Sequence, residues 1–196
     1  MTPMITLVFD GLSLTWIVER SSGLTALALL SLSTFLGAVV SAQWHSRRFP
    51  EVTAVSLHRN VALLALVFLV IHVLTTVLDT YVDVPLADAF IPFIGTYEPL
   101  WVGLGAIAFD LFLAVMVTSW LRGRMNARLW RWIHDLTYVL WVVAVVHAVG
   151  AAYERQLTLL VAGISVAIVA PTIALRYLRP SRTPSEATPA PTTETT

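Results

Sequence analysis

The chain has 196 residues, of which 57% are hydrophobic and only 12% charged, and its mean hydropathy is +0.78. A soluble domain usually carries about 25% charged residues, so these values exclude an ordinary water-soluble fold and indicate a protein embedded in lipid. The net charge is zero and cysteine is absent, which leaves no charge argument for nucleic-acid binding and excludes disulfides, iron–sulfur clusters and thiolate ligands.

Five apolar stretches are each long enough to cross a hydrocarbon core, which takes about 20 helical residues. The predicted spans are, in chain order, Ser22–Ala42, Leu57–Leu78, Leu100–Leu121, Trp130–Ala151 and Leu157–Leu178. Pro171 lies within the fifth span and predicts a kink there. The predicted fold class is all-α, an integral membrane helical bundle whose one domain occupies residues 21–179 and contains all five transmembrane helices.

The two terminal segments differ from this domain. Residues 1–20 are apolar but short and are interrupted by Asp10, which predicts an interfacial helix on the outer face. The alternative is a short or re-entrant sixth span. This segment lacks the basic region and cleavage site of a signal peptide, so we expect the first hydrophobic helix to direct insertion. Residues 180–196 are dominated by Ser, Thr, Pro, Ala and Glu, which predicts a disordered cytoplasmic tail.

Charge in the connecting segments predicts the orientation in the cell membrane. Arginines lie at the end of, or just after, the first, third and fifth spans, namely Arg47, Arg48, Arg122, Arg124, Arg128, Arg176, Arg179 and Arg182. The segment between the second and third spans has no basic residue but four acidic ones, Asp79, Asp83, Asp88 and Glu98. The positive-inside rule then predicts an outer N-terminus and a cytoplasmic C-terminus. The acidic segment either attracts a cation such as iron or is simply solvated.

Four of the five histidines lie in two spans. His58 and His72 are 14 residues apart in the second span, and His134 and His147 are 13 apart in the fourth. Both spans run from inside to outside in the predicted topology, so His58 and His134 share an inner level and His72 and His147 an outer level. At about 1.5 Å per residue the levels are about 20 Å apart. Ionisable groups inside a membrane are costly and are functional candidates by default.

Two parallel helices with a histidine pair at each of two levels suit two stacked b-type haems. A six-coordinate haem takes one imidazole on each face, and helical bundles build cofactor sites from facing helices. Fourteen residues return to nearly the same helix face, whereas thirteen leave the second side chain about 140° away. We therefore expect either a local distortion of the fourth span, such as a π-bulge, or haem planes rotated relative to each other. The alternative reading is four buried histidines bonded to neighbouring helices.

These motifs resemble the ferric reductase-like transmembrane domain, the haem-bearing membrane portion of ferric reductases and NADPH oxidases. The residues that carry the resemblance are His58 with Arg59, His72, the run Trp130-Arg131-Trp132-Ile133-His134, Tyr138 and His147. The segment Glu19–Leu24 also resembles the R-x-x-G entry to an early helix of that domain. The resemblance extends over about Trp16 to Leu178.

The resemblance implies that the histidines are axial ligands of haem iron in a cytochrome b. His58 and His134 would bind the inner haem b, and His72 and His147 the outer one. The reductases continue into a flavin- and nicotinamide-binding domain, but this sequence has no G-x-G-x-x-G fingerprint and no FAD or NAD(P) site is expected in it. The family also usually has six spans, one more than the five predicted here.

Several charged residues are further candidates. Arg59 and Arg131 adjoin the inner ligands and would either neutralise haem propionates or serve as positive-inside anchors. Arg20, near the outer surface, would bind an outer-haem propionate, attract an anionic acceptor, or pair with Glu19. Three other residues have less specific readings: Asp135 as a hydrogen-bonded carboxyl, Asp110 as a neutral group or part of a proton path, and His45 as a surface residue.

Two classes of function remain open. The first is an oxidoreductase membrane subunit for electron transfer, reduced by a separate cytosolic flavoprotein or by quinol. Its acceptor would be ferric iron, dioxygen or a periplasmic reductase, as in the haem membrane subunit of the methionine sulfoxide reductase system. The second is a haem-free proton or metal-ion transporter, which predicts that the histidines converge on one pocket. A purely structural subunit would leave four intramembrane histidines unexplained.

Overall fold

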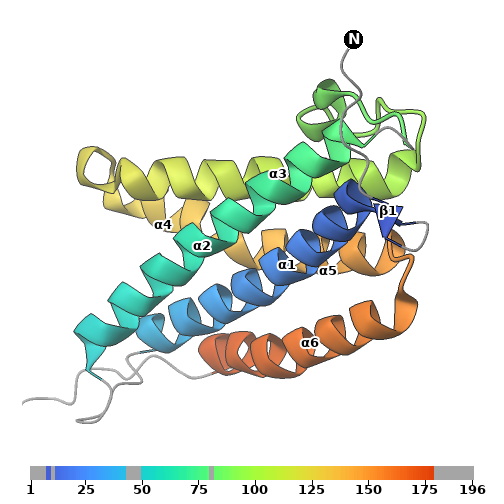
Figure 1. Cartoon of the computed structure of the whole chain (residues 1–196). Helices are drawn as coiled ribbons and strands as arrows, with labels where there is room; N and C mark the ends of the chain where they lie inside the picture. Colours follow the sequence, from blue (N-terminus) through green and yellow to red (C-terminus); the bar gives the residue numbers. More distant parts are fainter. Residues whose placement is uncertain (1–7, 10–11, 43–49, 80–81, 179–196) are drawn as a thin grey trace, which may run out of the picture.

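The computed structural model describes residues 8–9, 12–42, 50–79 and 82–178. Its secondary structure comprises β1 (Val8–Phe9), β2 (Leu12–Ser13), α1 (Leu14–Ser41), α2 (Glu51–Leu78), η1 (Leu86–Ala89), α3 (Pro99–Trp120), η2 (Arg122–Arg124), α4 (Ala127–Asp135), α5 (Thr137–Gly150) and α6 (Arg155–Leu178). Figure 1 shows these helices packed side by side as one bundle. The predicted all-α helical bundle is confirmed, apart from one antiparallel pair of two-residue strands, β1 and β2.

Five helical segments of the described chain are long and apolar enough to cross a membrane, with α4 and α5 together forming the fourth. The first differs most from its prediction, because α1 begins at Leu14 and includes Glu19 and Arg20. Ser22 remains compatible with the helix because its hydroxyl donates to the Val18 carbonyl, 2.6 Å away. Part of the segment predicted to be interfacial, Leu14–Arg20, therefore forms about the first two turns of α1, whereas residues 1–7 and 10–11 lie outside the described residues.

The predicted fourth span is broken at Leu136. Asn126 caps α4 by accepting a hydrogen bond from the backbone N–H of Arg128 at 2.8 Å. At the other end of α4, the N–H of Leu136 donates to the Ile133 carbonyl at 3.1 Å, a tightened turn of the 3₁₀ type. The distortion expected from the 13-residue histidine spacing is thus present, but it is a tightened turn and not a π-bulge. A 3₁₀ turn adds about 20° of rotation per residue relative to an α-helix, which reduces the expected angle of about 140° between the His134 and His147 side chains.

The centre of the bundle is α1, which packs against α2, α5 and α6, while α3 lies along α5 (Figure 1). Large apolar side chains such as Leu64, Val67 and Leu74 of α2 point outward and are about half exposed, as expected for a surface in contact with lipid. Small residues line the helix contacts instead, including Ala54 and Ala65, which are almost fully buried. Fewer large side chains between helices allow the backbones to approach closely.

One buried core joins all five spans. It consists of Leu30, Ala65, Ala108, Phe112, Leu140, Trp141 and Val169. The indole Nε1 of Trp141 donates to the Ser31 hydroxyl at 3.0 Å, which fixes α5 against α1 at mid-bundle. Helix α6 continues from Arg155 to Leu178 through Pro171 without interruption.

Candidate cofactor site between the histidine-bearing helices

The structure brings the four intramembrane histidines together in two pairs. The ring centroids of His58 and His134 are 6.1 Å apart, and those of His72 and His147 are 6.3 Å apart. Each pair takes one residue from α2 and one from the α4–α5 segment, which therefore run in the same direction. Fourteen helical residues separate the two levels by about 21 Å. In the described part of the chain, no group of three or more His, Asp or Glu side chains is arranged to hold a metal ion.

Three of the histidines donate through Nδ1 to a backbone carbonyl of a neighbouring helix. The bonds run from His58 to Ser33 at 2.9 Å, from His72 to Glu19 at 2.9 Å, and from His147 to Trp101 at 2.7 Å. A carbonyl oxygen only accepts, so Nδ1 must carry the proton in each neutral ring. This tautomer leaves the lone pair on Nε2, which is the arrangement typical of metal-ligating histidine.

A glycine lies four residues after each accepting carbonyl. In an α-helix the carbonyl of residue i already accepts from the N–H of residue i+4, so a side chain at i+4 would flank that oxygen. The pairs are Glu19 with Gly23, Ser33 with Gly37, and Trp101 with Gly105. A Cβ on these glycines would lie 2.9, 3.2 and 2.7 Å from the imidazoles of His72, His58 and His147, respectively. The missing side chain is therefore what admits the imidazole to the carbonyl.

The spacing along α1 matches that along α2. Gly23 and Gly37 are 14 residues apart, as are His72 and His58, and the two helices are antiparallel neighbours. The same contact between glycine and imidazole is thus repeated at both levels. The repeat is present in the sequence, but the spacing of glycines in an apolar span does not by itself indicate a contact with histidines of another helix.

His134 is held differently from the other three. Its Nδ1 lies 3.4 Å from the Ser119 hydroxyl, a long contact in which either group can donate. The indole of Trp130 stacks on the ring with a centroid distance of 5.0 Å and an interplanar angle of 23°. Arg122 in turn lies over Trp130, with its guanidinium carbon 4.3 Å from the ring centroid. No glycine stands beside this imidazole in the described chain.

The dimensions of both pairs fit one metal ion held between two imidazoles. Metal–imidazole bonds are about 2 Å long, and a ring centroid lies about 1 Å behind its nitrogen, so two opposed ligands have centroids about 6 Å apart. The measured separations of 6.1 and 6.3 Å meet this requirement. The interplanar angles of 75° and 67° are compatible as well, because axial imidazoles rotate freely about the metal–nitrogen axis. The residues present therefore fit a haem at each level.

Arg20 lies near the His72–His147 pair. Its guanidinium carbon is 4.7 Å from the ring centroid of Trp16 and 5.2 Å from that of Tyr153, so the cation lies against two aromatic rings. Within the described chain, its buried Nε has no hydrogen-bond acceptor. A buried donor without an acceptor suits an anionic group that binds at this level.

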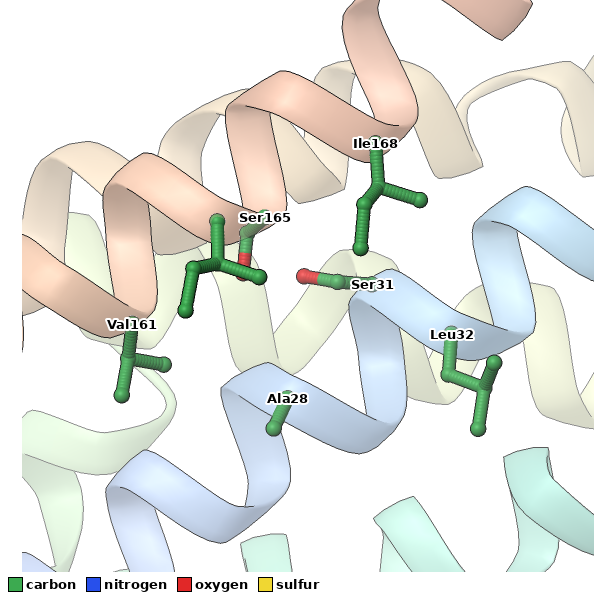
Figure 2. A pocket seen from close by; sticks show the side chains of 7 residues that line it. Ala28, Ser31, Leu32, Val161, Ser165 and Ile168 are labelled. Atoms are coloured by element: carbon green, nitrogen blue, oxygen red, sulfur yellow. The ribbon is translucent and has the colours of Figure 1, made fainter.

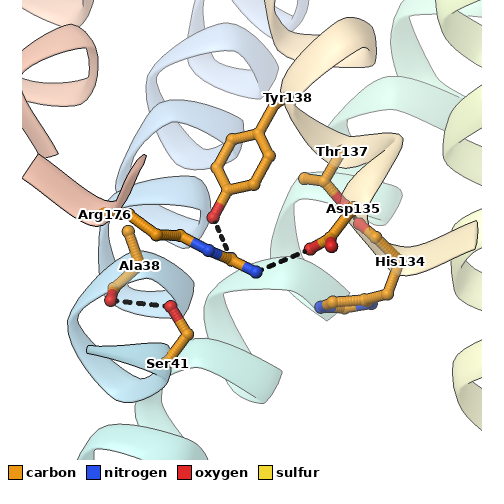
Figure 3. A network of polar contacts seen from close by, with 7 residues as sticks. All are labelled: Ala38, Ser41, His134, Asp135, Thr137, Tyr138 and Arg176. Carbon is orange, nitrogen blue, oxygen red and sulfur yellow. Dashed lines mark hydrogen bonds and ion pairs between the residues drawn. The ribbon is translucent and has the colours of Figure 1, made fainter. Parts of the chain in front are cut away.

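Arg59 and Arg131, the arginines singled out next to the inner ligands, are both exposed. Two other arginines contact neighbours of His134. Arg122 lies over Trp130, which stacks on His134, and Arg176 contacts Asp135 and Tyr138, which follow His134 by one and four residues (Figure 3). The contact of Arg176 with Asp135 and Tyr138 depends on how α6 packs against the bundle, and a local sequence pattern does not indicate this packing.

The remaining candidates are placed as follows. Asp135 is hydrogen-bonded, as expected, and its partner is Arg176. Asp110 is partly exposed near the middle of α3. Asp83 and Glu98 are exposed, but Asp79 and Asp88 are buried, so the acidic segment is not uniformly solvated. His45, Arg47, Arg48, Arg179 and Arg182 lie outside the described residues.

A groove of about 220 Å³ runs between α1 and α6. It is lined by Ala28, Ser31, Leu32, Val161, Ile164, Ser165 and Ile168, and Figure 2 shows Ser31 and Ser165 facing each other across it. Ser31 is the residue that accepts the Trp141 indole, and it also donates to the Leu27 carbonyl at 2.8 Å. Its hydroxyl is therefore satisfied by the bundle itself, and the groove adds no histidine or carboxylate to the site.

Comparison with known proteins identifies the domain. The model of the ferric reductase like transmembrane component matches residues 22–145, which is more than half of the chain. The match includes three of the four paired histidines and ends two residues before His147. No curated protein and no solved structure gives a significant match. Domains of this family generally bind haem and serve as membrane electron-transfer components. The chain therefore belongs to the ferric reductase-like transmembrane family and is a multi-pass membrane protein.

Proposed function

We propose that the chain is a di-haem b cytochrome that passes electrons across the membrane. In this proposal His58 and His134 bind the inner haem, and His72 and His147 the outer haem. The observation that carries it is the two histidine pairs with centroids 6.1 and 6.3 Å apart, three of whose members donate through Nδ1 and keep Nε2 for a metal. Haem iron, when bound, cycles between ferric and ferrous states and so carries one electron at a time.

The chain's own residues fix the ligands and their charge environment. The Ser33, Glu19 and Trp101 carbonyls set the tautomer and orientation of three imidazoles and strengthen them as ligands. Arg20 offers an unpaired buried N–H near the outer pair, suited to a propionate. Near the inner pair, Arg122, which lies over Trp130, and Arg176, which donates to Asp135, are candidates for this task in addition to Arg59 and Arg131.

We further propose that electrons enter at the His58–His134 level and leave at the His72–His147 level. The arginine-rich end of the bundle, which contains η2 and α4, would then face the cytoplasm, with the N-terminus outside. The donor would be a separate flavoprotein or quinol. The acceptor would be ferric iron, oxygen or a periplasmic reductase, which makes the chain the membrane subunit of an oxidoreductase.

The deciding experiment is a dithionite-reduced minus oxidised spectrum of the purified protein, with haem counted per chain as pyridine haemochrome. We expect two b-type haems per chain, falling to one in His58→Ala and to one in His72→Ala. The His58→Ala,His72→Ala double variant should contain none. Absence of haem from the unsubstituted protein, expressed with ample haem supply, would overturn the proposal and favour a haem-free ion transporter.

A further inference from the structure

The position of His134 depends on contacts unlike those that hold the other three histidines. Each of the others is fixed by a carbonyl of an adjacent unbroken helix, with a glycine four residues on. His134 instead has a 3.4 Å approach to the Ser119 hydroxyl and the stacked ring of Trp130. It also lies two residues before the break at Leu136, so the geometry of that break determines where its ring points.

The break lies between His134 and His147 and sets their relation to each other. In an unbroken α-helix, 13 residues would leave the two side chains about 140° apart. Here the Leu136 N–H donates to Ile133, and the Thr137 hydroxyl donates to the His134 carbonyl at 2.6 Å. The altered turn lets both imidazoles reach α2. Any change in this turn would move one histidine relative to the other.

Arg176 of α6 binds both sides of the break. Its Nη2 donates to Asp135 Oδ1 at 3.0 Å, and its Nη1 donates to the Tyr138 hydroxyl. Asp135 is the last residue of α4 and Tyr138 the second of α5, with Leu136 between them. Figure 3 shows the guanidinium bridging the two side chains, with His134 beside Asp135. A planar guanidinium with donors at fixed angles specifies such a geometry better than a flexible ammonium does.

The ion pair by itself adds little stability, because the side chains of Arg176 and Asp135 are 28% and 40% exposed. Its main effect is to restrict the geometry of the break between α4 and α5. Bonds to residues on both sides of a break restrict the bend and rotation between two helices, which neither partner could do alone.

We propose that Arg176 is a positioning residue that holds the α4–α5 break in the conformation that presents His134 to His58. The inference rests on the proposed function in one respect, namely that the His58–His134 pair binds haem iron. The restraint that Arg176 places on the α4–α5 break does not depend on that function. Arg176 lies outside the segment matched by the family model, so this role is assigned by the geometry of this chain alone.

The test uses the full chain, which contains no cysteine and can therefore be spin-labelled at two introduced positions. Labels at Ala127→Cys in α4 and Val146→Cys in α5 would be about 28 Å apart along a continuous helix, a range suited to pulsed electron–electron resonance. We expect Arg176→Gln to broaden the distance distribution and Arg176→Lys to restore part of it. Arg155→Gln, at the exposed opposite end of the same helix, should leave it unchanged.

Haem measurements provide the second readout. In Arg176→Gln we expect loss of the inner haem or a changed low-spin resonance from it, with the outer haem unaltered. If Arg176→Gln does not accumulate, Tyr138→Phe removes one side of the bridge and should broaden the distribution less. An unchanged distance distribution together with an unchanged inner haem in Arg176→Gln would overturn the inference. If the unsubstituted protein bound no haem, the proposed function would fail, whereas the distance measurement would still decide the role of Arg176.

Discussion

Gly105 of α3 faces the imidazole of His147 so closely that a Cβ on it would lie 2.7 Å from Cε1 of the ring. The same face of α3 supplies the Trp101 carbonyl, 2.7 Å from Nδ1 of that histidine. The glycine and the carbonyl therefore form one binding position for the ring. The three glycines beside histidines differ in how closely an added Cβ would approach the imidazole, so their alanine variants form a graded series of tests.

We expect Gly105→Ala and Gly23→Ala each to remove most of the outer haem, because an overpacked contact costs about 1–3 kcal/mol and displaces the ligand. Gly37→Ala should weaken the inner haem less, since its Cβ would be 3.2 Å from the His58 ring and a small shift relieves it. Haem per chain measures each effect. Gly163→Ala is the matched control, because nothing lies within 4 Å of its Cβ. Equal haem in all four variants would contradict the proposal that the three glycines leave room for the histidine rings.

The hydrogen bond between Trp141 and Ser31 predicts a stability effect separate from haem binding. Ser31→Ala leaves the buried indole N–H without its acceptor, which costs about 1–3 kcal/mol. Trp141→Phe removes the donor too, so adding Ser31→Ala to it should cost much less than it does in the unsubstituted chain. Thermal unfolding in detergent, analysed as a double-mutant cycle, measures this coupling. Additive losses would show that the bond contributes nothing.

Removal of the Arg20 charge should lower the midpoint potential of the outer haem. A nearby cation stabilises the reduced form, which carries one more negative charge, so Arg20→Gln favours the oxidised form. Spectroelectrochemical titration would resolve the two proposed haems, and the inner one should shift little because it would lie about 21 Å away. Arg155→Gln provides the control, because Arg155 is an exposed arginine at the start of α6. An equal shift in both haems would argue against a local role.

The proposed orientation predicts which introduced cysteines a membrane-impermeant maleimide can reach. Asp83 and Arg124 are exposed and lie at opposite ends of the bundle. Asp83→Cys should react in intact cells, whereas Arg124→Cys should react only after permeabilisation. The cysteine-free parent measures background labelling. The reverse pattern would invert the topology and with it the assignment of inner and outer levels.

The sequence predicted the spans and the histidine pairs because both depend on short-range regularities, namely apolar length and spacing along a helix. The histidine spacing predicted a distortion of the fourth span as one of two alternatives, but neither its position at Leu136 nor its type, since a 3₁₀ turn leaves the apolar composition unchanged. Nor did the sequence predict that α1 begins at Leu14, because Glu19 and Arg20 look like the end of a membrane span when their tertiary partners are unknown.

The choice of arginines shows the same limit. Arg59 directly follows His58 and so points about 100° away from it, whereas Arg131 lies three residues before His134, and both arginine side chains are exposed. Arg122 and Arg176 come close to His134 through the return of the chain after α3 and of α6 onto the bundle. Contacts of this kind depend on the packing of whole helices, which spacing within one helix does not report.

The matched 14-residue intervals of α1 and α2 limit how this domain can diverge. One residue inserted between Gly23 and Gly37 would turn the rest of α1 by about 100° and advance it by 1.5 Å, separating one glycine from its histidine. An equal insertion between His58 and His72 would restore the matching rise, but it would also turn His58 by about 100° about its own helix, so the two contacts would not both form again. Neither interval can therefore change by a single residue, so descendants of this chain can vary in side chains along α1 and α2 far more readily than in the length of either interval.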